Sequence, residues 1–197
     1  MIMQDRFSKQ IAFLLELDKM KNIYRQTLVL HEDRAENDAE HSFHLAIMAC
    51  ILAEHAKEEI NILHAIKMVL IHDVVEIDAG DTYCYDNVGY QDKAEREQKA
   101  RDRIFAILPE DQKEEYIALW NEFEERKTPE SKFANALDRI QPMLLNYQKG
   151  GISWKKHAIH AEQVKQRNLP ITQEGSDSIY KLAQEIIKLA KQEGMLL

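Results

Sequence analysis

One apolar segment that ends in charged residues constrains this chain more than any other part of its sequence. Residues 62–71 are mostly apolar, which predicts a helix buried on most sides. His72 and Asp73 follow at its end, and Glu76 comes one turn after His72 on the same face. Ionisable groups on a buried helix are costly unless they are paired or bind a metal. The segment therefore predicts charge chemistry inside the fold.

The composition of the chain favours helices. Its 197 residues include only six Gly and four Pro, which leaves little room for the many turns of an all-β fold. The good helix formers Leu, Ala, Glu, Lys and Gln dominate the sequence. The length suits one domain with a sizeable core. We therefore predict a single all-α domain over residues 1–197.

Capping residues and helix breakers indicate where helices begin and end. Asn37, followed three residues later by Glu40, is typical of a capping box and predicts a helix start. The helix of the opening segment is expected over about 60–78, with Gly80 ending it. Pro170 is expected to break a helix near the C-terminus, because proline lacks an amide hydrogen.

Charge and cysteine content restrict the partners and the compartment. The net charge is 26 − 34 = −8, so a large basic surface for DNA or RNA is not expected. A small anionic substrate remains possible, because one arginine or one metal ion can hold it. Cys50 and Cys84 form no C-x-x-C pair, and Cys50 is expected in the core. Without a signal-peptide pattern or an apolar run of the ~20 residues that span a membrane, we predict a cytoplasmic protein.

Four polar residues on or beside apolar helix faces together suggest a metal site. His41 begins the apolar stripe of the second predicted helix, and Asp138 lies beside the stripe of a helix that begins near Thr128. A lone histidine at such a position is more often a hydrogen-bonded core residue. With His72 and Asp73, however, the set offers two imidazoles and two carboxylates. Such a set suits one divalent transition metal (Mn, Co, Fe, Ni or Zn) better than Ca.

Glu76 would project near such a metal without having to bind it, because it lies one turn after His72. A carboxyl group in that place can take a proton from an attacking water or give one to a leaving group. The alternative interpretation is a surface glutamate at a helix end. Its position beside the His-Asp pair favours the catalytic role.

Three motifs resemble a known family. They are Glu-Asn-Asp-Ala-Glu-His-Ser at 36–42, His-Asp-Val-Val-Glu-Ile-Asp-Ala-Gly-Asp at 72–81, and Asn-Ala-Leu-Asp-Arg at 135–139. In this order they resemble the HD-domain metal-dependent phosphohydrolases, and most of all the 5′-deoxynucleotidase-like branch. The resemblance implies a single HD-domain helical bundle with its motif core at about 37–145. It also implies a homodimer.

The resemblance assigns a role to seven residues. It implies that a divalent metal is held by His41, His72, Asp73 and Asp138, that Glu76 is the catalytic acid or base, that Arg25 contacts the substrate phosphate, and that Asp81 lies near the sugar. The implied reaction removes the 5′-phosphate from (deoxy)nucleoside monophosphates.

The chain departs from this branch at one substrate-facing position. Gln26 follows Arg25 where the bacterial deoxynucleotidases have a Trp that helps to exclude ribonucleotides, so the preference for deoxyribose stays open. Two alternatives to the nucleotidase also stay open. One is hydrolysis of another nucleotide such as an alarmone, although Ile77 stands where alarmone hydrolases have a catalytic Asp. The other is a non-catalytic helical module that binds a metal or a nucleotide.

Overall fold

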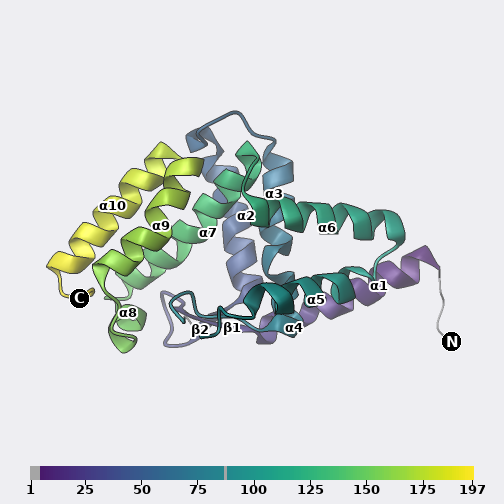
Figure 1. Ribbon diagram of the computed structural model, residues 1–197, viewed down its shortest axis with the longest axis horizontal. Coiled ribbons are helices and arrows are strands. Elements are labelled where there is room, and N and C mark those ends of the chain that lie inside the picture. Colours follow the sequence, from purple (N-terminus) through teal and green to yellow (C-terminus); the bar gives the residue numbers. More distant parts are fainter. Residues whose placement is uncertain (1–4, 87) are drawn as a thin grey trace.

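A computed structural model describes residues 5–86 and 88–197, and these fold almost entirely into helices (Figure 1). The α-helices are α1 (Arg6–Leu17), α2 (Asp38–Leu52), α3 (Ile62–Ile71), α4 (Glu76–Ala79), α5 (Lys93–Phe105), α6 (Glu110–Glu125), α7 (Pro129–Gln148), α8 (Ile152–Lys156), α9 (Ala161–Gly175) and α10 (Asp177–Gln192). Three 3₁₀ turns, η1 (Asp18–Asn22), η2 (Ala53–His55) and η3 (His72–Val75), and two strands, β1 (Tyr24–Leu28) and β2 (Ala35–Asn37), complete the fold. The predicted all-α class is confirmed.

Helix α7 lies at the centre of the molecule and contacts α2, α3, α6, α9 and α10. To one side, α9 and α10 pack against each other near the C-terminus (Figure 1). To the other side, α1, α5 and α6 extend towards the N-terminal end (Figure 1). The position of α7 follows from its sequence. A Thr128–Ser131 capping box starts the helix, and Phe133, Leu137 and Ile140 are fully buried along it.

The predicted helix at 60–78 is not continuous, which corrects the sequence-based expectation. Helix α3 ends at Ile71, the chain tightens into η3, and α4 resumes at Glu76. The side chain of His72 donates from Nδ1 to the carbonyl of Val69 at 2.9 Å, which gives this carbonyl a partner outside the regular helical pattern. Gly80, with φ of 74°, ends α4 as predicted.

Two further expectations are wrong and one is confirmed. Pro170 lies inside α9 and does not break it, because Val164 and Thr172 on either side are fully buried and hold the helix in place. Cys50 is exposed, since α2 turns Leu45 and Ala49 towards the core instead. The capping box between Asn37 and Glu40 is present at the start of α2. The sequence also predicts a loop over residues 81–87, and its last residue, Asn87, lies outside the described residues.

A small antiparallel sheet was not predicted. Strand β1 pairs with β2, so that Tyr24 lies opposite Asn37 and Leu28 opposite Ala35. This pairing fixes Arg25 beside the first turn of α2. In residues 5–86 and 88–197, no helix is both long enough and apolar enough to cross a membrane.

Candidate active site

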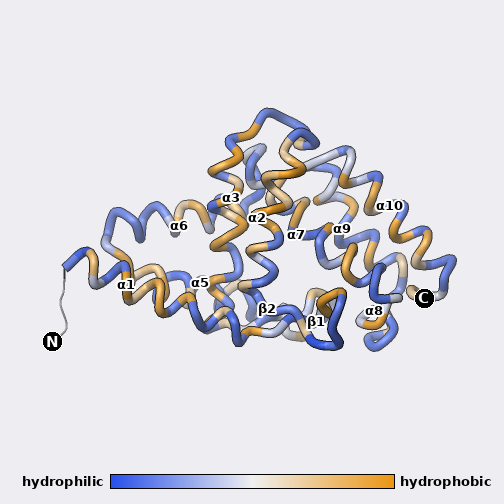
Figure 2. The backbone as a smooth tube through the Cα atoms, turned by 180° about the vertical axis from the view of Figure 1, so that it is seen from behind, coloured by the Kyte–Doolittle hydropathy of each residue, from blue (hydrophilic) through white to orange (hydrophobic). Residues whose placement is uncertain are grey.

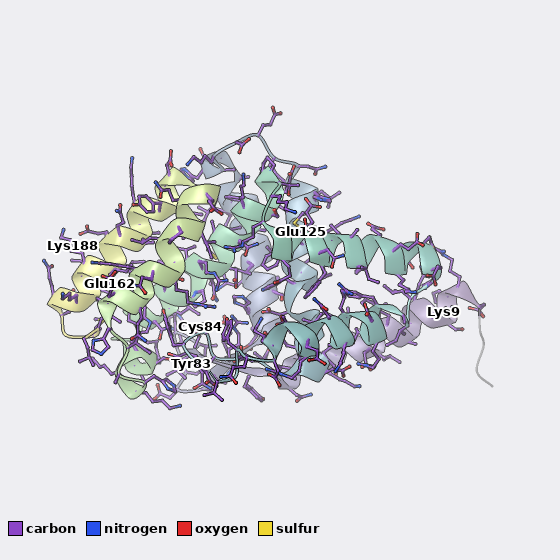
Figure 3. The ribbon with its side chains drawn as sticks, viewed as in Figure 1. Lys9, Tyr83, Cys84, Glu125, Glu162 and Lys188 are labelled. Carbon is purple, nitrogen blue, oxygen red and sulfur yellow. The ribbon has the colours of Figure 1, made fainter. Side chains whose placement is uncertain are left out.

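A polar cavity of about 380 Å³ runs along one side of α7. Its walls come from β1, the η3–α4 segment, residues 81–85 with Tyr90, α5 and α9, so parts of the chain far apart in sequence meet there. Figure 3 shows Tyr83 and Cys84 of residues 81–85 next to each other at this place. Of the predicted site residues, six line the cavity: Arg25, His72, Asp73, Glu76, Asp81 and Asp138. His41 lies behind this surface and is fully buried.

Both predicted histidines turn Nε2 towards a common point, because Nδ1 of each ring is hydrogen-bonded on the other side. His41 Nδ1 lies 3.1 Å from the side-chain oxygen of Gln141, and His72 Nδ1 lies 2.9 Å from the carbonyl oxygen of Val69. Each Nδ1 therefore donates its proton away from the site, which leaves Nε2 free to act as a ligand. Among the described residues, the buried Nε2 of His72 has no hydrogen-bond partner.

The two predicted aspartates face these nitrogens. Asp138 Oδ1 lies 3.1 Å from Nε2 of His41 and 3.7 Å from Nε2 of His72. Asp73 Oδ2 lies 3.1 Å from Nε2 of His72 and 3.8 Å from Nε2 of His41. Atoms bound about 2.1 Å from one cation lie roughly 3.0–3.4 Å from each other at angles near 90–110°. The two 3.1 Å distances lie in this range, and those of 3.7 and 3.8 Å correspond to wider angles of roughly 125–130° at the same bond length. The four side chains could thus hold one divalent cation.

The electrostatics of these groups favour positive charge at their centre. Burial lowers the pKa of His72, but the carboxylates of Asp73 and Asp138 outweigh it and raise that pKa to about 10. Burial opposes the charge on Asp138, yet the neighbouring imidazoles of His41 and His72 hold its pKa well below the usual value. Two nitrogen and two oxygen donors in such surroundings suit a divalent transition metal.

Arg25 reaches the same centre from β1. Its Nη1 donates to Asp73 Oδ2 at 2.7 Å and lies 3.4 Å from Asp38 Oδ1. Burial opposes the charge on Arg25, but Asp73, Glu76, Asp81 and other carboxylates hold its pKa well above the usual value. A guanidinium fixed beside the metal ligands and facing the cavity is well placed to bind a phosphate.

Glu76 is a buried carboxyl group that favours the protonated form. Burial, followed by the negative charges of Asp73 and Asp38, raises its pKa well above the usual value. Its Oε2 is buried and has no hydrogen-bond partner within the described residues. Asp38 lies beside it, and burial together with Asp73 raises the pKa of Asp38 to about 7. Glu76 can therefore hold a proton at the wall of the cavity, as an acid or base in the reaction requires.

Asp81 and Gln26 line the cavity beyond Glu76. Burial raises the pKa of Asp81, while Arg25 acts against that rise. The side-chain oxygen of Gln26 lies 3.3 Å from Nζ of Lys156 and 3.2 Å from Nε2 of His157. Gln26 is thus tied to α8 and its end, whereas Asp81 remains available to a hydroxyl group in the cavity.

Sequence reasoning missed two buried polar residues that support the ligands. Gln141, one turn after Asp138 on α7, accepts from His41 and donates to Glu36 at 2.6 Å. Asp38, in the first turn of α2, is fully buried beside Arg25. The spacing of Gln141 from Asp138 is the one sequence signal that pointed to it. Asp38 lies within the 36–42 motif, but acidic residues are common in the first turn of helices, so its position did not single it out.

A model of the HD domain matches residues 17–180, which is most of the chain. The chain belongs to the HD-domain family. Its fold is similar to that of a predicted metal-dependent phosphohydrolase from Magnetospirillum magnetotacticum, with 46% identity and a TM-score of 0.94. That match covers 100% of this chain and 99% of the other.

Curated relatives of this HD-domain chain carry the name that the motifs suggested. The 5′-deoxynucleotidase HDDC2 of Homo sapiens is 30% identical over 135 residues, which are 68% of this chain and 65% of that protein. The protein of the same name from Xenopus laevis is 31% identical over 139 residues, or 71% of this chain and 65% of that one. The chain thus spans slightly less than two thirds of the length of these two relatives. The family predicted from the motifs is confirmed.

Proposed function

We propose that this chain is a metal-dependent phosphomonoesterase that removes the 5′-phosphate from nucleoside or deoxynucleoside monophosphates. One observation carries the proposal: two imidazole nitrogens and two carboxylates converge beside Arg25 and Glu76, at the wall of one cavity. The names of the curated relatives, both 5′-deoxynucleotidases, support the same reaction and substrate class.

In this proposal His41, His72, Asp73 and Asp138 hold the divalent metal. When bound, such a cation polarises a phosphoryl oxygen and makes an adjacent water more acidic. Mn, Co, Fe, Ni and Zn all suit a set of two nitrogen and two oxygen donors. Gln141 and the Val69 carbonyl fix the two imidazole rings in the tautomer that presents Nε2.

The remaining residues bind the substrate and move a proton. Arg25 binds the 5′-phosphate, which competes with the carboxylate of Asp73 for the guanidinium. Glu76 in its protonated form gives its proton to the departing 5′-oxygen, and it recovers a proton from the water that attacks phosphorus. Asp81 accepts a hydrogen bond from a hydroxyl group of the sugar. The products are a nucleoside and inorganic phosphate.

A phosphate-release screen tests the proposed function. Purified protein is loaded separately with Mn, Co, Fe, Ni and Zn and given deoxy- and ribonucleoside monophosphates, with an alarmone as a further substrate. We expect inorganic phosphate from the monophosphates and loss of that activity in His72→Ala. Equal rates in wild type and His72→Ala contradict the proposal, and pyrophosphate release from the alarmone alone favours the other HD-domain reaction.

We also propose that the chain forms a homodimer through one apolar face of α2 and α3. Phe43 and Ile51, two turns apart on α2, are 65% and 66% exposed, and Ile47 lies between them. Leu63 and Leu70 extend this face on the neighbouring α3. Figure 2 shows hydrophobic stretches on both helices. Exposed apolar side chains gathered on packed helices are typical of an interface.

Light scattering after size exclusion tests the dimer. The wild type is expected at the mass of two chains, and Phe43→Asp at the mass of one, because a buried charge is costly in the interface. Leu182→Asp is the matched control, since Leu182 is a half-exposed leucine on the distant α10. A monomeric wild type, or a dimeric Phe43→Asp variant, contradicts this interface. The single domain over 1–197 and the cytoplasmic location stay predictions.

A further inference from the structure

The part of the cavity that faces α9 contains two arginines that have no described carboxylate at hydrogen-bond distance. Arg139 comes from α7 and Arg167 from α9, and both line the cavity. The nearest carboxylate oxygen to Arg139, Oδ2 of Asp138, lies 3.9 Å away, beyond hydrogen-bond distance. Within residues 5–86 and 88–197, Arg167 forms a hydrogen bond only with Tyr90. The Nε atoms of both arginines are shielded from solvent and lack a hydrogen-bond partner there.

Two other cations of the cavity are paired with carboxylates. Arg25 donates to Asp73 at 2.7 Å, and Lys93 forms an ion pair with the buried Glu97. Arg126 also lines the cavity without a described carboxylate at that distance, but none of its nitrogens is both buried and unpartnered. A buried cation without a partner is costly, and a bound anion relieves that cost. Arg139 and Arg167 combine a buried, unpartnered Nε with the lack of a described carboxylate at hydrogen-bond distance.

Arg167 is held rigidly in place. Its Nη2 donates to the hydroxyl of Tyr90 at 2.8 Å, and its guanidinium lies over the Tyr90 ring at 5.4 Å from the centroid. A guanidinium fixed in this way loses little freedom when it binds a ligand, which favours affinity.

The two arginines line one cavity together with Cys84. Burial raises the pKa of the Cys84 thiol, and the charges of Arg167, Arg139 and Arg25 act against this rise. The hydrogen-bond partners of the arginines differ. Arg25 donates to Asp73 of the predicted metal site, whereas Arg167 donates to Tyr90. Arg139 directly follows Asp138 on α7.

We propose that Arg139 and Arg167 form a subsite for a second phosphate group of the nucleotide, separate from the phosphate that Arg25 and the metal ligands bind. This proposal rests on the proposed function, because it adds a second anionic group to the same substrate. The planar guanidinium matches a phosphate in bidentate fashion, and two of them provide enough donors for one phosphate group. The second phosphate is either a 3′-phosphate or the β-phosphate of a diphosphate chain.

A binding experiment tests the subsite without hydrolysis. Titration calorimetry on the full chain, in chelator and at one fixed salt concentration, compares dAMP, dADP and deoxyadenosine 3′,5′-bisphosphate. Two charge-assisted contacts predict that one of the two-phosphate ligands binds at least about tenfold more tightly than dAMP. Arg139→Gln and Arg167→Gln are each expected to abolish most of that ratio. Lys165→Gln, which removes an exposed positive charge from the same helix as Arg167, is expected to retain it.

Each outcome decides the proposal. A preference for the bisphosphate assigns the subsite to a 3′-phosphate, and a preference for dADP assigns it to a β-phosphate. Equal affinity for all three ligands overturns the subsite, and so does a ratio that survives both arginine substitutions. If Arg139→Gln and Arg167→Gln weaken dAMP as much as the two-phosphate ligands, both arginines serve the single phosphate and the subsite is again wrong. Because no turnover is needed, these results stand even if the phosphate-release screen fails.

The preference for a two-phosphate nucleotide over dAMP is then measured by turnover. With the metal that supports phosphate release, KM for the preferred two-phosphate nucleotide is expected at least about tenfold below that for dAMP. Arg167→Gln should raise this KM more than it lowers kcat, because Arg167 donates to Tyr90 and to no proposed metal ligand among the described residues. An equal loss of kcat with both substrates contradicts a role restricted to binding.

Discussion

The two ends of the cavity carry opposite excesses of buried charge. At the end formed by η3 and α7, carboxylates outnumber the cation Arg25, and two imidazoles face them. At the end formed by α9, Arg139 and Arg167 lack a carboxylate within hydrogen-bond distance. The first arrangement suits a cation and the second an anion, and we call them the cation-binding end and the anion-binding end. In the functions that we propose, a nucleotide bound to a metal supplies both kinds of charge, and the difference between the two ends sets its orientation.

The largest expected effect comes from breaking the cation-binding end alone. His72→Ala removes one of four proposed ligands and leaves a buried carboxylate, Asp73, without its neighbour. We expect phosphate release to fall by more than about 100-fold, since even residues that only support metal ligands are worth 10–100-fold. Metal content by mass spectrometry should fall with it. His55→Ala, at an exposed position, is the control, and an active, metal-loaded His72→Ala contradicts the ligand assignment.

Loss of a residue that positions a proposed metal ligand should have a smaller effect than loss of the ligand itself. Gln141→Ala removes the group that fixes Nδ1 of His41 and leaves Glu36 without its amide donor. Metal affinity is expected to fall by about 10–100-fold, measured by competition with a fluorescent chelator. The same substitution should leave the ratio of affinities for two-phosphate and one-phosphate nucleotides unchanged. Metal affinity equal to the wild type shows that the His41 ring is fixed without Gln141.

The cation-binding end was open to prediction because its residues follow helical spacing. His41 begins an apolar stripe, and the His72–Asp73 pair follows another, so burial of both was expected from the pattern alone. The break at His72 was not foreseen, because it depends on where one side chain finds a carbonyl partner. Helix continuity through Pro170 was missed for a related reason. Packing against α7 and α10 outweighs the local cost of proline.

The anion-binding end offered a weaker signal, because Arg139 ends the 135–139 motif but nothing in the sequence linked it to Arg167. The two arginines lie on different helices, and their presence in one cavity depends on the close approach of α7 and α9. That approach requires Gly175, where a Cβ would collide with the carbonyl of Lys132 and the side chain of Ala136. Neither a glycine within a helix nor an isolated arginine predicts such a contact from sequence. The place of Cys84 in the cavity wall was not predicted either, since its surroundings come from segments that only the fold brings together.

Metal removal should destabilise the cation-binding end and leave the anion-binding end folded. A cation at 100 times its dissociation constant adds about 2.7 kcal/mol to the stability of the folded chain. For a chain of this size, that corresponds to a change in Tm of about 5–10 °C. Differential scanning calorimetry with and without chelator measures it, and His72→Ala should show no such difference. A wild-type Tm that ignores both chelator and added metal contradicts the coupling of the site to the core.

The smallest expected effect concerns the charge around Cys84 and is read from its alkylation rate. Burial raises the pKa of this thiol, so in a Cys50→Ser background the rate with iodoacetamide should be slow at pH 7 and still rising above pH 9. Arg167→Gln removes a positive charge that lowers this pKa. The pKa then rises further, and the rate at pH 8 is expected to fall by about two- to threefold. Lys165→Gln should leave it unchanged. Faster alkylation in Arg167→Gln means that the arginine acts as a steric cover and not through its charge, and the contrast between the two ends then loses its electrostatic basis.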